Sequence, residues 1–140
     1  MDERKPTTLE WLLYAWLCLN TFLGLRLLLE GLYGQGYFTI YGSGWTVGIP
    51  LIFGLSATAI LLWRLLTPTW INLGFAAGLY LLQTIVVLLP GRAYGFQLGI
   101  CVNYLLIDDP GYIVKINLLA IVGAALYGVA AYWRFDEQKP

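Results

Sequence analysis

Four long apolar stretches that are poor in charge constrain this chain more than any other feature. Each is long enough to cross a hydrocarbon core of about 30 Å, which takes about 20 helical residues. Glycine, proline or aspartate marks every junction between them. The predicted spans run over Leu9–Tyr33, Val47–Leu66, Trp70–Leu89 and Tyr112–Trp133. We therefore expect an all-α integral membrane protein, a four-transmembrane-helix bundle, with residues 1–140 as a single membrane domain.

Composition favours the same class. The chain is 59% hydrophobic and 11% charged, whereas a soluble domain carries about 25% charged residues. A surface that faces lipid needs no ionised side chains, but a water-facing surface this apolar would aggregate. The first stretch is longer than the apolar region of a signal peptide, about 7 to 15 residues, so we interpret it as an uncleaved span.

Lysine and arginine indicate an orientation. With four spans, five of them share the side of the two termini and three lie towards the other side. The first group is Arg4, Lys5, Arg64, Arg134 and Lys139, and the second is Arg26, Arg92 and Lys115. The positive-inside rule then predicts a multi-pass protein of a cytoplasmic or inner membrane, with both termini cytoplasmic.

The two outer connections are longer than simple turns. Residues 34–48 combine glycine with aromatic side chains, which is typical of a loop at the headgroup level. Residues 93–107 are 15 residues without a charge, too short to span, so we predict an interfacial or partly re-entrant segment. Leu62-Trp63-Arg64 and Tyr132-Trp133-Arg134 end two spans alike. They indicate two tandem helical hairpins or, equally, the Trp and Arg that a cytoplasmic interface selects.

A candidate polar cluster lies on the outer side. Arg26 and Glu30 are four residues apart near the end of the first span and are expected to pair. The full candidate cluster is Arg26, Glu30, Arg92, Asp108, Asp109 and Lys115. One interpretation is an ion pair that fixes helix depth. The other is a pocket for a zwitterionic headgroup or a small polar ligand. Asp108-Asp109-Pro110-Gly111 also fits a turn that caps the fourth span.

The centre of the predicted bundle lacks ionised residues. Its polar side chains are Asn20, Thr21, Ser56, Thr58, Tyr80, Gln83 and Thr84. Proton-coupled transport relies on intramembrane carboxylates or histidine, so that class is disfavoured, and these neutral groups are expected to hydrogen-bond between helices. The small residues Gly74, Gly78, Ala120, Ala124 and Gly128 are candidate helix-packing positions, either within the chain or against another protein.

Few residues of the chain are candidates for metal binding, redox chemistry or catalysis. The chain has no histidine, and its two cysteines, Cys18 and Cys101, form no Cys-x-x-Cys motif. We therefore predict no metal, no cofactor and no catalytic residue. There is no basic run of the kind that binds nucleic acid.

Three functional hypotheses follow. The first is a non-catalytic interaction or accessory protein, a small subunit or oligomerising bundle in a larger membrane assembly, whose partners are lipid and other membrane subunits or further copies. The alternative is a binder or facilitator for a small molecule, lipid or ion, acting through the outer mouth of an oligomer by way of Asn20, Ser56 and Gln83. A membrane enzyme that uses Glu30 or the aspartates is the third, disfavoured because no nucleophile motif accompanies them.

Overall fold

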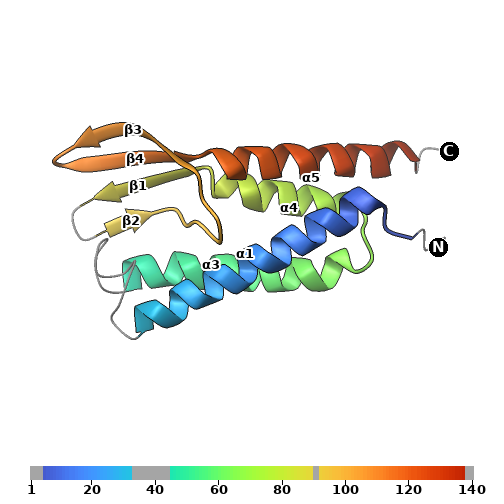
Figure 1. Cartoon of the computed structure of the whole chain (residues 1–140), viewed down its shortest axis with the longest axis horizontal. Helices are drawn as coiled ribbons and strands as arrows, with labels where there is room; N and C mark the ends of the chain where they lie inside the picture. The colour runs from blue at the N-terminus through green and yellow to red at the C-terminus, as the bar shows by residue number, and fades with distance from the viewer. Residues whose placement is uncertain (1–4, 33–44, 90–91, 138–140) are drawn as a thin grey trace.

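The computed structural model describes residues 5–32, 45–89 and 92–137, and it is mostly helical with a small antiparallel sheet (Figure 1). The helices are α1 (Thr8–Leu32), α3 (Trp45–Leu65), α4 (Trp70–Leu82) and α5 (Leu118–Glu137). The strands are β1 (Ile85–Leu89), β2 (Arg92–Tyr94), β3 (Asn103–Asp109) and β4 (Tyr112–Asn117). Three helices, α1, α3 and α5, are long and apolar enough to cross a membrane. The membrane class predicted from the sequence is thereby supported.

Side chains just before the helices fix where they begin. Thr7 and Glu10 form a capping box at α1, in which the Glu10 carboxylate accepts from the Thr7 N–H at 2.6 Å and the Thr7 hydroxyl accepts from the Glu10 N–H at 3.3 Å. At α4 the Thr69 hydroxyl accepts from the N–H of Asn72. At α5 the side chain of Asn117 accepts from the N–H groups of the first turn.

The predicted helical span Trp70–Leu89 is wrong after Leu82. Helix α4 has 13 residues, about 20 Å at 1.5 Å per residue, and ends at Leu82. The remainder of the predicted span is strand β1, with the sequence Ile-Val-Val-Leu-Leu. Hydropathy does not distinguish a buried strand from a helix, and β-branched residues favour the strand. The four-span bundle is therefore not confirmed.

The fourth predicted span is also displaced. Its first six residues, Tyr112–Asn117, form β4, and the helix runs from Leu118 to Glu137. The first two spans agree with α1 and α3 to within two residues where the structure describes them. The aromatic connection predicted at 34–48 lies mostly outside the described residues, since 33–44 are not described.

The sheet has the strand order β2-β1-β4-β3, and all its pairs are antiparallel. Strands β3 and β4 form a hairpin whose turn is Pro110-Gly111, and a bulge interrupts the register between Leu105 and Ile107. The predicted interfacial segment 93–107 thus contributes to two strands, and residues 95–102 between them are irregular.

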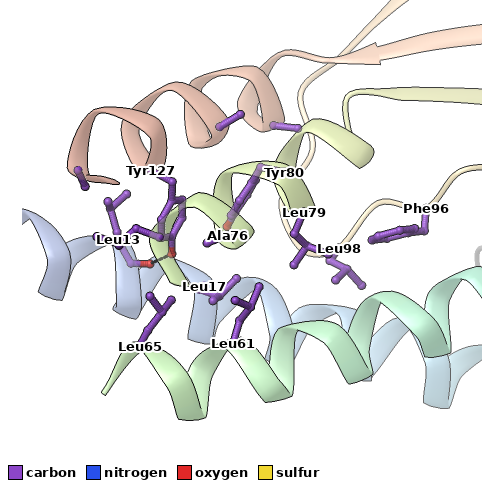
Figure 2. Packing of buried hydrophobic residues seen from close by; sticks show 14 of the residues in the cluster. Leu13, Leu17, Leu61, Leu65, Ala76, Leu79, Tyr80, Phe96, Leu98 and Tyr127 are labelled. Atoms are coloured by element: carbon purple, nitrogen blue, oxygen red, sulfur yellow. Dashed lines mark hydrogen bonds between the residues drawn. The ribbon is translucent and has the colours of Figure 1, made fainter. Parts of the chain in front are cut away.

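The sheet occupies one end of the molecule and both chain termini lie at the other (Figure 1). Helix α1 packs on α3, and α4 packs on α5. Helices α3 and α4 and helices α1 and α5 are also in contact, and the two tandem hairpins stay a prediction. The apolar core runs between the pairs and continues to Phe96 and Leu98 next to the sheet (Figure 2).

Candidate functional site

Residues 95–102 return from the sheet to the helices, where they form the most constrained junction in the described structure. Phe96 and Leu98 are buried, and both lie on the side of their segment that faces α1 and α3 (Figure 2). A Cβ added to Gly24 of α1 would lie 2.7 Å from Leu98 Cδ2, and one added to Gly54 of α3 would lie 2.5 Å from Phe96 Cε2. These glycines are therefore required for the close approach of the segment.

Two neutral amides hold this segment by its backbone. Gln83 Oε1 accepts from the N–H of Leu98 at 2.9 Å, and Asn20 Oδ1 accepts from the N–H of Ile100 at 3.1 Å. Asn20 Nδ2 also donates to the Tyr80 hydroxyl at 2.9 Å, which links α1 to α4. Between the two anchored residues, Gly99 has a φ of +75°, a conformation that favours glycine. We call the two amides of Asn20 and Gln83, together with the Tyr80 hydroxyl to which Asn20 donates, the amide network.

The other mid-bundle polar residues do not join this network. The hydroxyls of Thr21, Thr58 and Thr84 donate to backbone carbonyls three or four residues earlier. Ser56 is exposed on the outside of α3. In the part of the chain that the structure describes, Ser56 therefore does not join Asn20 and Gln83, and the path through an oligomer stays a prediction. Among the described residues, every buried side-chain polar atom has a hydrogen-bond partner.

A buried ion pair joins the first and last helices at the terminal end. Arg134 Nε lies 2.5 Å from Glu10 Oε1, and Arg134 Nη2 lies 2.7 Å from Glu10 Oε2. The two side chains are 8% and 5% exposed. A small hollow beside the pair is lined by Leu9, Ala130 and Trp133 among others. Such a bidentate contact is directional as well as strong.

Glu10 was not a predicted site residue, and Arg134 was expected only at a membrane interface, from the orientation and from the Tyr132-Trp133-Arg134 ending of its span. The signal that was present is the Thr7-x-x-Glu10 spacing of a capping box, which places a carboxylate at the start of α1. Nothing in the sequence pairs it with Arg134, which is 124 positions away.

Two buried tyrosines, Tyr80 and Tyr127, bond to α1 at Asn20 and at Leu13. The rings of Tyr80 and Tyr127 stack with centroids 5.5 Å apart. The Tyr127 hydroxyl donates to the carbonyl of Leu13 at 2.6 Å, which ties α5 to α1 (Figure 2). Because Tyr127 is fully buried, this contact is protected from water and orders the middle of the helical part.

The structure brings only part of the predicted outer cluster together. Arg26 and Glu30 pair at 2.7 Å on an exposed face of α1. Asp108 and Asp109 lie at the far end of the β3–β4 hairpin, separated from the end of α1 in Figure 1. Lys115 lies within β4, opposite Val86 of β1 and Leu105 of β3. Arg92 is the first residue of β2, and its side chain is not among those that the structure describes.

The aspartates do not cap α5. Asp109 Oδ1 accepts from the N–H of Gly111 at 2.9 Å, which closes the hairpin turn instead. The cap is Asn117, because a strand intervenes between the turn and the helix. A turn was one of the two predicted roles, but its position relative to the helix was wrong.

The predicted helix-packing residues divide into two groups. Ala120 and Ala124 are buried on α5. A Cβ on Gly74, Gly78 or Gly128 would meet nothing within 4 Å, so these three do not pack within the described chain. Helices α4 and α5 approach closely at Gly123, where a Cβ would lie 2.7 Å from the ring of Tyr80. A Gly-x-x-x-Gly spacing marks a face of a helix but does not say what that face meets.

The two cysteines are not bonded to each other. The Cys101 thiol contacts the carbonyl of Gly99 at 3.6 Å. Within the described ranges, no group of three or more metal-ligating side chains converges.

Comparison with known proteins gives no assignment, since no family model, curated protein or solved structure matches the chain.

Proposed function

We propose that the chain is a non-catalytic integral membrane interaction or accessory protein that packs against another membrane protein. The observation that carries the proposal is the outward-facing glycine surface of α4. Gly74 and Gly78 have open space where a side chain would be, so the close-approach motif of this helix is not used within the described fold. We call Gly74 and Gly78 the glycine face.

The glycine face suits a helix of another membrane protein. Small residues let two backbones approach closely, and this contact is favourable in lipid because it adds van der Waals packing that lipid chains do not match. Phe75, next to Gly74, is 68% exposed and extends the same surface. The opposite side of α4, with Leu73, Ala76 and Leu79, is already buried inside the molecule.

The buried polar groups support a structural role. Asn20 and Gln83 use their amides on the backbone of residues 95–102, and Glu10 and Arg134 use their charges on each other. Phe96 and Leu98 fill the space beside the amide network. These contacts disfavour the alternative of a ligand or ion path through the middle of the bundle.

The finer topology is part of the proposal. Helix α4 is too short to cross alone, and we infer that it enters the membrane from the end of the termini, where Trp70 contacts Phe135, and that residues 95–102 pack beside its other end, where Gln83 accepts from the N–H of Leu98. The two termini lie at one end (Figure 1), the end that carries Lys5, Arg64 and Arg134, so we infer that this end is cytoplasmic. The proposed location is a cytoplasmic or inner membrane.

Purification from a mild detergent tests the proposal. We expect the native chain to run as a complex with other polypeptides or with further copies of itself, and Gly74→Leu and Gly78→Leu to release it as a monomer. Phe53→Leu, at an exposed phenylalanine of α3, is the matched control and should leave the complex intact. A native chain that runs as a bare monomer would contradict the proposal.

A further inference from the structure

The two edges of the sheet differ in how they are covered. Strand β2, at one edge, contacts α3. Strand β3, at the other edge, pairs with β4 and lies on the outside of the molecule (Figure 1). Among the described elements, β4 is the only strand bonded to β3. One side of the β3 backbone therefore presents N–H and C=O groups that no described strand satisfies.

The side chains of this edge do little to discourage pairing. All seven residues of β3 are exposed, and Leu105, Leu106 and Ile107 form an apolar centre. Edge strands are usually protected by lysine, proline, shortness or a bulge. Strand β3 contains no lysine or proline, and it has only the bulge between Leu105 and Ile107.

Strand β3 begins near the membrane and runs outward from it. Its first residue, Asn103, pairs with Asn117, the residue directly before α5. Because α5 is a candidate membrane span, β3 begins near the outer boundary of the hydrocarbon region, and Leu105 to Asp109 lie beyond it. An extended segment on the outer side of the membrane can therefore reach this edge.

We propose that β3 is a docking edge for an extended segment of another protein, which adds an antiparallel strand to the sheet. The docked segment has an apolar centre, which lies opposite Leu105, Leu106 and Ile107. It also has two consecutive cationic residues, which lie opposite Asp108 and Asp109. The aspartates end the strand, so charge complementarity sets both the direction and the register of the partner. This inference rests on the proposed function and names the kind of partner.

A second copy of the chain fits this edge less well. The axis of strand β3 lies along that of α5, and the strand runs in the opposite sense (Figure 1). Antiparallel pairing of two β3 strands would turn the second copy upside down relative to the membrane, against the single orientation inferred above. An extended segment of another protein has no such restriction.

A synthetic peptide tests the edge with the full-length protein in nanodiscs. The probe has a central run of alternating valine and threonine and two lysines at its N-terminal end, which antiparallel pairing brings to Asp108 and Asp109. We expect it to bind about 10-fold tighter than the same peptide with glutamates, because two cross-strand charge pairs change from attractive to repulsive. Asp108→Lys with Asp109→Lys should reverse that preference.

Backbone pairing has its own control. N-methylation of the alternate peptide amides that face β3 should abolish binding, while methylation of the other alternate set should leave it. Tyr94→Lys on the β2 edge should have no effect. Equal binding of the lysine and glutamate peptides, or equal effects of the two methylation patterns, would overturn the inference.

A cross-linking experiment addresses the second copy. In a chain with Cys18→Ala and Cys101→Ala, Leu106→Cys should give no covalent dimer of the chain in membranes. A dimer would assign the edge to self-association and overturn the inference. If the peptide fails to bind but Gly74→Leu still releases a companion, the docking edge fails while the proposed function stands.

Discussion

The two ends of this molecule reach close packing by different means. At the terminal end, full helices meet, and a buried ion pair between Glu10 and Arg134 fixes α1 against α5. At the sheet end, α4 stops at Leu82, and the segment 95–102 packs Phe96 and Leu98 against α3 and α1 beside that end. A helix that ends inside the membrane therefore needs apolar side chains that pack beside its end. It also needs polar groups that satisfy the backbone of the segment that carries those side chains.

The largest expected effect is at the terminal end. Arg134→Met leaves the Glu10 carboxylate buried without its partner, which should lower the free energy of unfolding by about 3–5 kcal/mol. Unfolding in mixed micelles titrated with dodecyl sulfate measures it. The double change Glu10→Met with Arg134→Met should recover most of the loss, because no unpaired charge remains.

Arg64→Met is the matched control for that prediction. Arg64 is exposed at the same end, so its change should stay within about 0.5 kcal/mol. If the single Arg134 variant were as stable as the double variant, the ion pair would not be what fixes this end.

Two glycines, Gly99 in the segment 95–102 and Gly74 in α4, are expected to respond in opposite ways to substitution by alanine. Gly99→Ala adds a Cβ at positive φ that collides with Asn20, and we expect a loss of about 2 kcal/mol or more in the free energy of unfolding. Gly74→Ala, where a Cβ meets open space in a helix, should raise it by about 0.5–1 kcal/mol. Thermal unfolding of both variants in detergent checks the opposite signs, and a loss at both would contradict the glycine assignments.

The amide network is expected to have a similar or smaller effect. Asn20→Leu removes the acceptor of the Ile100 N–H and the partner of the Tyr80 hydroxyl, which should cost about 1–3 kcal/mol. Hydrogen exchange should show faster exchange at Ile100 while α5 near Arg134 is unchanged. Thr21→Val, which removes only a bond within its own helix turn, is the control and should leave Ile100 protected.

The smallest expected effect tests the link between the two ends. Tyr127→Phe removes one hydrogen bond to the Leu13 carbonyl and should lower the free energy of unfolding by about 1 kcal/mol. Tyr132→Phe, at an exposed tyrosine of the same helix, should not change it. Equal effects in dodecyl sulfate titrations would mean that the Tyr127 bond adds nothing between the ends.

The sequence by itself determined the membrane class, the positions of α1 and α3, and the pairing of Arg26 with Glu30. These depend on local properties, namely hydropathy over about 20 residues, breaking residues and spacing along one helix. The absence of ionised residues from the centre of the bundle was also predictable, since none occurs between Leu12 and Leu25 of α1 or between Trp70 and Leu89.

Only the tertiary structure decided the rest. An apolar run such as Ile85–Leu89 satisfies the hydropathy of a span and of a buried strand equally, and pairing with β4 selects the strand. The contacts of Glu10 with Arg134 and of Asn20 with Ile100 join positions 124 and 80 residues apart, which no local pattern encodes. The same holds for the glycines: spacing suggested Gly74 and Gly78, whereas the fold placed its close contacts at Gly24, Gly54 and Gly123.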